Sequence, residues 1–358
     1  MTIAYINRIA TGVPPHDVHD VFVRMAQLVY ARDARIMGLL DRMTEGSVIE
    51  HRYSFFQPAP DWASGPHLDT ERFYERGRFP DTAARMRMFE RRAPELAAAT
   101  VERLGLGADR SRISHLVITC CTGFSAPGLD FELIDRCGLP SSVERTMIGF
   151  MGCYAAINAL KLARHIVRSE PDARVLVLNL ELCTLHLQET ADLGQLLCFL
   201  LFADGCAASL VTAEAPGIAL DSFRAIVVPD TRQLMSWHIR NLGFDMVLSG
   251  QVPFAIYDAL RRGSNEILAS APTGSIDLWA VHPGGRTILD AVERALDLAP
   301  SALAASREVL RRYGNMSSAT VMFVLDALMR AATHGQNGCA MSFGPGLTAE
   351  TMRFHMVA

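Results

Sequence analysis

Three short segments each place a reactive side chain where a strand or loop meets a helix. Cys153 follows a glycine in GFMGCYAA (149–156) and precedes a helical run. A cysteine there faces the positive end of a helix dipole, which lowers a thiol pKa from about 8.5 toward roughly 3.5–7.5. His282 follows an apolar strand, and Asn315 precedes a helix in YGNMSSA (313–319). Cysteine, histidine and asparagine together form a nucleophilic set.

Each of these residues alone also has a structural interpretation. The cysteine could be a buried residue in a Gly/Ala-rich contact, and the histidine could be satisfied by backbone groups. The asparagine could stand at an ordinary junction between two helix caps. The spacing also permits a papain-like thiol hydrolase, so composition and periodicity do not choose the reaction.

The elements that must position these residues alternate along the chain. Apolar periodicity predicts strands and helices in both halves. Continuous apolar strands between helices indicate a sheet covered on both faces, hence an α/β fold. The similar halves predict a division into residues 1–212 and 213–358. The expected helices are 18–43, 81–104, 155–168, 254–269, 287–298, 302–313 and 317–332, and the expected strands are 115–119, 174–178, 207–212, 276–281 and 339–342.

Composition excludes several functional classes. The chain has 358 residues, of which 50% are hydrophobic and 20% charged, and a net charge of −4. This slightly negative charge lacks the excess of basic residues that attracts nucleic acid or an anionic membrane. No apolar run reaches the roughly 18 residues that a membrane helix needs. The N-terminus does not resemble a secretory signal. The eight cysteines lack metal-ligand spacing and are expected to be reduced thiols, so we expect a cytoplasmic protein without a metal.

Five ordered motifs resemble those of the thiolase superfamily and, more narrowly, of the chalcone-synthase-like type III polyketide synthases of bacterial type. The resemblance covers nearly the whole chain. LFADG (201–205) resembles the family's LFGDG, and SFGPG (342–346) resembles its GFGPG loop. The other three are MGCYAA (151–156), HPGG (282–285) and YGNMSSA (313–319).

The resemblance implies a five-layered αβαβα thiolase fold with two pseudo-duplicated halves. It further implies that Cys153 carries an acyl-CoA starter as a thioester, held as a thiolate by His282. With Asn315, the histidine would then stabilise charge on malonyl-CoA as it decarboxylates, and the enolate would attack the acyl group. Cyclisation would give a pyrone, resorcinol or phloroglucinol-type product. Family members are homodimers, and their CoA thioesters are substrates, so no metal or redox cofactor is implied.

Further residues carry expected roles from the same resemblance. The residues expected at the gate and cavity are Phe202, Cys183, His186, Trp237, Met246 and Ser317. Trp237 falls where plant members have a glycine and should fill volume, whereas Met246 can adapt to flexible chains. We therefore expect an aliphatic or small starter.

The CoA mouth and the subunit contact depart from the family pattern. Arg42 matches one basic CoA-binding position, but the other two are Leu39 and Gly46. Gly284 and Gly285 should let the pantetheine arm approach the backbone. Where a family methionine reaches the partner's cavity, this chain has Ala126.

We compared the polyketide synthase assignment with three alternative functions. A ketoacyl-ACP synthase III-like enzyme of fatty-acid initiation shares the fold and the Cys, His and Asn, but its histidine typically lies in a His-Gln-Ala-Asn context. A hydroxymethylglutaryl-CoA synthase needs a glutamate acid/base near the cysteine, for which we find no motif. A catalytically inactive scaffold conflicts with the intact catalytic set.

Overall fold

A nine-stranded mixed sheet forms the centre of the computed structural model, which describes residues 2–357. The strand order is β11-β12-β13-β8-β1-β7-β6-β4-β5. Strand β4 is parallel to β5 and β6, and β11 is parallel to β12, whereas the remaining neighbours are antiparallel. The strands are β1 (Tyr5–Gly12), β4 (His115–Cys120), β5 (Glu144–Gly149), β6 (Val175–Leu182), β7 (Asp204–Thr212), β8 (Gly217–Val227), β11 (Leu278–Val281), β12 (Asn337–Gly344) and β13 (Thr348–Val357).

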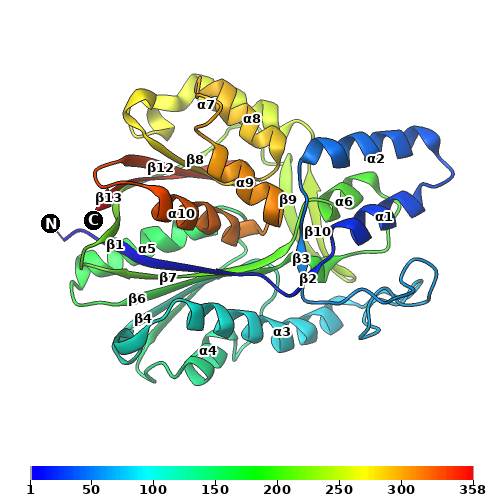
Figure 1. The fold of residues 1–358 in the computed structure, drawn as a ribbon, viewed down its shortest axis with the longest axis horizontal. Helices are drawn as coiled ribbons and strands as arrows, with labels where there is room; N and C mark the ends of the chain where they lie inside the picture. Colours follow the sequence, from blue (N-terminus) through cyan, green and yellow to red (C-terminus); the bar gives the residue numbers. More distant parts are fainter. Residues whose placement is uncertain (1, 358) are drawn as a thin grey trace.

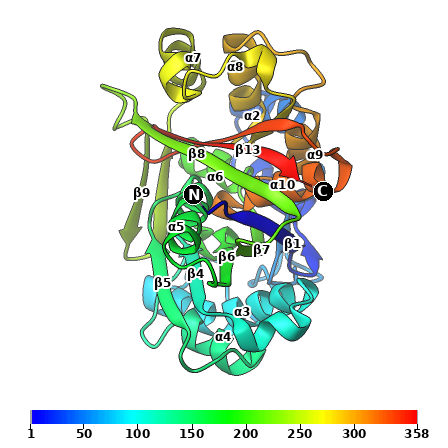
Figure 2. The ribbon, with the colours of Figure 1, turned by 90° about the vertical axis from the view of Figure 1, so that its left-hand side faces the viewer.

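Helices cover the sheet on its outer faces and fill the space between its two halves (Figures 1 and 2). Every residue of β6 and β7 is buried, as expected for strands covered on both faces. The predicted five-layered α/β fold is confirmed. The central layer contains α5 (Ala155–Ser169) and α10 (Thr320–Ala331), with α9 (Ala304–Tyr313) beside α10. One outer layer contains α3 (Thr82–Arg103) and α4 (Leu129–Cys137). The other outer layer contains α7 (Val252–Ile267) and α8 (Arg286–Ala295).

The predicted division of the chain falls in the short link between β7 and β8. Strand β7 ends at Thr212 and β8 begins at Gly217. However, β1 pairs with both β7 and β8, so one continuous sheet joins the two halves. The division into two similar halves at residues 212 and 213 stays a prediction.

The predicted helix 18–43 is wrong as a single element. The structure has α1 (His19–Val29) and α2 (Ala34–Ser47), separated by a turn. Asp33 ends the turn and caps α2 by accepting hydrogen bonds from the backbone N–H groups of Arg35 and Ile36, both at 3.1 Å. An aspartate at an N-cap favours this break in an otherwise helical pattern.

The remaining elements surround the ends of the sheet. The sequence pattern missed β1, β5, β8 and β13, and also the hairpin that spans residues 235–248. Among residues 2–357 no helix combines the length and apolar character needed to cross a membrane. The smaller elements are α6 (Leu193–Phe199), β2 (His16–Asp17), β3 (Tyr53–Ser54), β9 (Met235–Arg240) and β10 (Gly243–Leu248).

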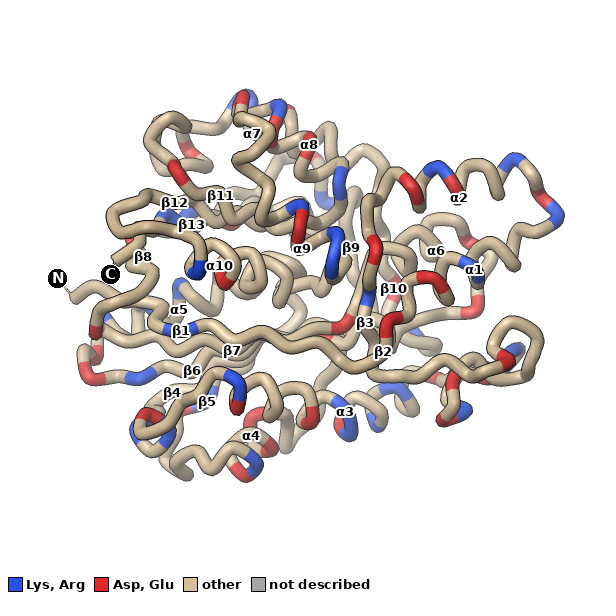
Figure 3. The backbone as a smooth tube through the Cα atoms, in the orientation of Figure 1, with Lys and Arg blue, Asp and Glu red and all other residues tan. Residues whose placement is uncertain are grey.

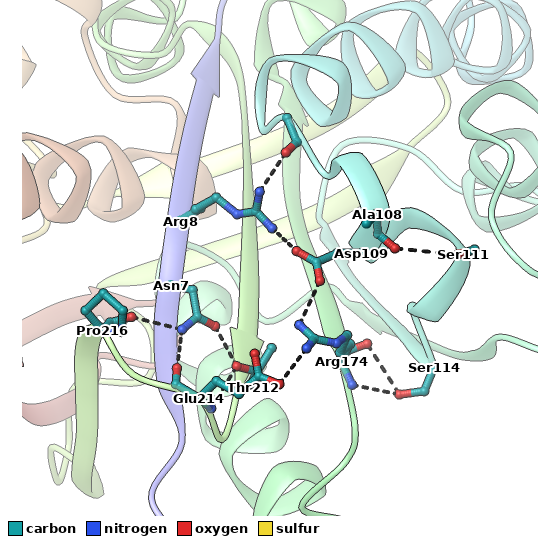
Figure 4. A network of polar contacts seen from close by, with 11 residues as sticks. Asn7, Arg8, Ala108, Asp109, Ser111, Ser114, Arg174, Thr212, Glu214 and Pro216 are labelled. Atoms are coloured by element: carbon teal, nitrogen blue, oxygen red, sulfur yellow. Dashed lines mark hydrogen bonds and ion pairs between the residues drawn. The ribbon is translucent and has the colours of Figure 1, made fainter.

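A charged network ties β1 to the start of β6 (Figure 4). The Arg174 guanidinium contacts Asp109 at 2.8 Å and Glu214 at 2.6 Å, and Asp109 also pairs with Arg8 on β1. This network lies at the amino end of β6, so it stabilises the strand register away from the carboxyl end, where the candidate site forms. Elsewhere basic and acidic residues are interspersed along the chain (Figure 3), so its electrostatic field is mixed in sign.

Candidate active site

Cys153 lies in a tight turn between β5 and α5. Gly152 has a φ of +81°, and a Cβ at this position would lie only 2.2 Å from Pro345 Cδ, so the turn requires glycine. Cys153 is 6% exposed, and its Sγ lies 3.9 Å from Ser317 Oγ. As predicted, the cysteine directly precedes a helix, here α5.

Burial sets the protonation of the two titratable members of the predicted catalytic set. It raises the pKa of the Cys153 thiol to about 12, although hydrogen bonds from Ser317 and Asn315 act in the opposite direction. It also lowers the pKa of His282 to about 3. The shift at Cys153 is opposite to the one predicted from the helix terminus, because removal from water outweighs the dipole. Burial therefore acts against the thiolate–imidazolium pair that the sequence analysis expects.

His282 follows β11 with both of its ring nitrogens buried and without a hydrogen-bond partner among the described residues. Its backbone N–H donates to the Met341 carbonyl at 2.7 Å, which fixes the main chain at the end of the strand. A Cβ at Gly284 would lie 3.7 Å from His282 Nε2, so this glycine leaves space beside the imidazole. A neutral, unpartnered imidazole can accept a proton or donate one to a substrate.

Asn315 is held by its own loop so that its amide N–H₂ faces the same space. Its Oδ1 accepts a hydrogen bond from the Ser317 backbone N–H at 2.8 Å, and its Nδ2 is 3.3 Å from the Gly284 carbonyl. Its backbone pairs with Leu201 and Ala203, which flank Phe202. An amide fixed in this way supplies a donor that does not titrate.

A single cavity of about 550 Å³ is lined by Cys153, His282 and Asn315. We call it the catalytic cavity. The structure therefore brings together the three side chains predicted from separate motifs. Phe202 also lines this cavity.

The mouth of the catalytic cavity contains the predicted CoA residues and one that the sequence analysis missed. Arg42, Gly284 and Gly285 line it, together with Gly46. Arg286 also lines it and begins α8; its guanidinium donates to the Gly46 carbonyl at 3.2 Å. Its position directly after Gly284 and Gly285, both expected at the CoA site, could have identified it from the sequence. The mouth thus has two arginines instead of one.

A second, smaller space of about 40 Å³ lies on the inner side of Cys153. We call it the inner cavity. Cys153 and Phe202 line both spaces, as do Cys198 and Met246, so the two are neighbours. The predicted cavity residues found in its wall are Phe202, Cys183, Trp237, Met246 and Ser317.

His186 does not line either space, contrary to the prediction. It is fully buried, and burial lowers its pKa to about 3. Its Nδ1 accepts from the Phe244 backbone N–H at 3.2 Å, which leaves Nε2 to donate to the Thr122 carbonyl at 2.7 Å. The ring packs edge-on against Trp237 at 5.6 Å. His186 therefore supports the cavity wall from behind, because a 3₁₀ turn aims it away from the cysteine.

Trp237 lines the inner cavity and is fixed in place. Its indole N–H donates to the Cys121 carbonyl at 2.8 Å. Cys121 and Cys198 line the inner cavity beside Cys153 and Cys183, so four of the eight cysteines meet there. The sequence analysis expected Cys121 and Cys198 only to be reduced thiols, since scattered cysteines give no positional signal. No group of side chains able to hold a metal ion occurs among residues 2–357.

Comparisons with known proteins agree with this geometry. Residues 4–215 match the model of the N-terminal domain of chalcone and stilbene synthases, and residues 219–358 match that of their C-terminal domain. The chain is 38% identical over 298 residues to bisdemethoxycurcumin synthase from Oryza sativa subsp. japonica, covering 77% of this chain and 74% of that protein. It is 32% identical to the alpha-pyrone synthesis polyketide synthase-like Pks18 from Mycobacterium tuberculosis, covering 99% of this chain and 92% of the relative.

Solved structures give the same result over the full length. The 1,3,6,8-tetrahydroxynaphthalene synthase from Streptomyces coelicolor, a bacterial type III polyketide synthase, superposes with a TM-score of 0.87 at 27% identity, covering 100% of both chains. PKS-I from the brown alga Ectocarpus siliculosus superposes with a TM-score of 0.88 at 29% identity, covering 100% of this chain and 99% of the other.

Proposed function

Because the chain belongs to the chalcone and stilbene synthase family, and is a type III polyketide synthase with acyltransferase chemistry, we propose that Cys153 is its nucleophile and that His282 and Asn315 assist it. The observation that carries this assignment is that all three side chains line the catalytic cavity. The family match favours this reaction over the carrier-protein-dependent alternative.

The first step is transfer of the acyl starter from CoA to the enzyme. The Cys153 thiol gives its proton to the neutral His282 imidazole as its sulfur attacks the thioester carbonyl carbon. The Ser317 hydroxyl, 3.9 Å from the sulfur, and the Asn315 amide favour the developing thiolate. Collapse of the tetrahedral intermediate breaks the bond to the CoA sulfur, which takes the proton from His282 and leaves as CoA thiol, and the acyl group stays on Cys153.

The second step is decarboxylative condensation. A malonyl-CoA in the catalytic cavity loses carbon dioxide. The electron pair of the broken carbon–carbon bond stays on the thioester fragment and forms an enolate. The enolate oxygen accepts hydrogen bonds from His282 and Asn315. Each such preorganised donor contributes about 2.7–4 kcal/mol on oxyanion-hole precedent. The enolate carbon then attacks the acyl carbon and releases the Cys153 thiolate, so the chain grows by one two-carbon unit.

Binding of the CoA thioester falls to the mouth of the catalytic cavity. Arg42 and Arg286 lie at this mouth, where their positive charges would bind the phosphates of CoA. Gly284 and Gly285 leave space for the pantetheine arm. Arg286 supports the proposal because it supplies the charge missing at Leu39 and Gly46. An arginine matches phosphate oxygens bidentately.

We assign an aliphatic or small starter and a short ketide chain to this enzyme. The support is the inner cavity of about 40 Å³, closed by Trp237. Cyclisation follows to a pyrone, resorcinol or phloroglucinol-type product. We also assign a homodimer, with the loop around Ala126 near the subunit contact; Phe131 and Met147, exposed at 46% and 40%, line a hollow beside this loop.

The test is turnover of malonyl-CoA with acyl-CoA starters in the absence of any carrier protein. We expect ketide products that mass spectrometry detects with wild type and not with Cys153→Ala. Products that form only when an acyl carrier protein is added would favour the fatty-acid initiation enzyme. A Cys153→Ala variant with full activity would reject the nucleophile.

A further inference from the structure

Arg52 is a fully buried arginine that lies behind the active site and outside the cavities described above. It directly precedes β3 and is 0% exposed. Its guanidinium makes four hydrogen bonds, to the Nδ1 and the carbonyl of His19 at 3.0 and 3.4 Å, and to the carbonyls of Phe199 and Phe202, the latter at 3.2 Å. None of these acceptors is a carboxylate. A buried cation without an ion pair costs free energy, so stability alone does not explain this arginine.

The chain that Arg52 holds contains Phe202. We call residues 199–203 the Phe202 segment. Helix α6 ends at Phe199 and β7 begins at Asp204, so the segment lies between regular elements, where carbonyl groups need an external donor. Arg52 Nη1 donates to two of these carbonyls, at Phe199 and at Phe202. Because Phe202 lines both the catalytic cavity and the inner cavity, Arg52 fixes part of the wall of the active site from outside it.

The Phe202 segment in turn holds Asn315. The Asn315 N–H donates to the Leu201 carbonyl at 3.0 Å, and the Asn315 carbonyl accepts from the Ala203 N–H at 2.9 Å. Arg52 also packs on the other side of this pairing, since a Cβ at Gly314, which has a φ of +66°, would lie 2.8 Å from Arg52 Cγ. Arg52 therefore contacts both backbone segments that determine where the Asn315 amide lies.

The main chain around Arg52 is itself fixed. The Arg52 carbonyl accepts from the Val18 N–H at 2.8 Å, and the Arg52 N–H donates to Asp17 Oδ1 at 3.2 Å. The two preceding N–H groups, of residues 50 and 51, donate to the Arg311 carbonyl at 2.8 and 3.2 Å. Arg311 belongs to the last turn of α9, which leads into the loop of Asn315. The guanidinium thus extends from a rigid base.

We propose that Arg52 is a positioning residue for decarboxylation, which holds the Phe202 segment and thereby sets the direction of the Asn315 amide toward the enolate oxygen. This inference rests on the proposed function and adds a residue to it that touches no substrate. Acyl transfer has Cys153 and His282 as its reacting groups, so it depends less on Arg52. The role therefore predicts a defect confined chiefly to one step, which a loss of stability alone does not produce.

The experiment measures two rates on the same preparation of each variant. One is release of carbon dioxide from malonyl-CoA, and the other is single-turnover acyl transfer from butanoyl-CoA, whose amplitude counts the folded, active enzyme. Arg52→Met keeps an unbranched stem and removes the donors. Since a misplacement of about 1 Å costs about 10²-fold, we expect decarboxylation to fall about 10- to 100-fold relative to acyl transfer. Arg52→Lys keeps the cation but not the planar fork that reaches two carbonyls, so its ratio should fall severalfold.

Arg85 provides a matched control, because it is also 0% exposed and also donates to backbone carbonyls. It lies on α3, and its acceptors are the carbonyls of Pro80, at 3.0 Å, and Leu185. Arg85→Met removes comparable buried donors away from the Phe202 segment. It should therefore lower stability as Arg52→Met does and leave the ratio of the two rates at its wild-type value.

A double variant tests whether Arg52 acts through Asn315. In the Asn315→Ala enzyme, adding Arg52→Met should slow decarboxylation less than about twofold, because coupled residues are not additive. A folded Arg52→Met enzyme with the wild-type ratio, or full additivity in the double variant, would overturn the inference. If Arg52→Met does not fold, Arg52→Lys decides, and an unchanged ratio there has the same meaning. A wild type that neither decarboxylates malonyl-CoA nor accepts an acyl group would instead reject the proposed function.

Discussion

Replacing Trp237 with alanine should lengthen the ketide product. The indole has nine ring atoms and a ketide unit has three heavy atoms, so at uniform packing density its removal makes room for about two to three further units. Because the indole lines the inner cavity beside Cys153, the new space lies where the chain grows. The variant should therefore add extensions and not merely slow the enzyme.

The substitution also has a stability cost that must be measured. Removing a buried tryptophan side chain costs about 3–5 kcal/mol, and Trp237 is only partly buried, so we expect about 3 kcal/mol. The variant also leaves the Cys121 carbonyl without its indole donor. Urea denaturation at assay temperature shows whether enough folded enzyme remains to compare products.

The assay is mass spectrometry of the products formed from one starter and excess malonyl-CoA. Trp237→Phe should give an intermediate distribution, and Trp62→Ala, on a loop outside the cavities described, should give the wild-type one. If folded, active Trp237→Ala makes only the wild-type products, the inner cavity does not set chain length.

Three further predictions follow from buried polar groups. Arg52→Met should lower the free energy of unfolding by about 2–6 kcal/mol in urea denaturation, because two of its acceptors, the partly buried carbonyls of Phe199 and Phe202, lose their donor at about 1–3 kcal/mol each; a change within error would refute this role. Burial raises the pKa of Glu181 from 4.5 to about 7, so its contribution to stability is complete below pH 4.5 and disappears as the pH rises through 7. Wild type should thus lose about 3 kcal/mol more than Glu181→Gln over this interval, and parallel pH profiles would contradict the shift. Asn315→Ala should slow malonyl-CoA decarboxylation about 10²–10³-fold and acyl transfer to Cys153 by a smaller factor, whereas equal loss of both steps would contradict a role chiefly at the enolate.

The convergence of the catalytic set could be predicted because each residue ends or follows a regular element. Cys153 precedes α5 and His282 follows β11, so the sheet and its central helices determine where they lie. The motifs then identified the reaction, which spacing alone left open between a hydrolase and a synthase. The helix 81–104 was equally readable, since Asp81 caps it by accepting from the Ala84 N–H at 2.7 Å.

Other features depend on side-chain direction and packing, which the sequence does not display. His186 occupies a family cavity position, yet a short turn directs its ring behind Trp237. Arg286 lies at the mouth of the catalytic cavity, where its guanidinium donates to the Gly46 carbonyl. The pKa of Cys153 was predicted with the wrong sign because its burial depends on all the elements around it.

The most direct test of the central claim is to map the acylated residue by peptide mass spectrometry after incubation with an acyl-CoA starter and no malonyl-CoA. Four thiols line the inner cavity: those of Cys121, Cys153, Cys183 and Cys198. We predict a thioester on Cys153 alone, with no acyl group on the Cys153→Ala enzyme. An acyl group on one of the other three cysteines, or retained in that variant, would contradict the assignment.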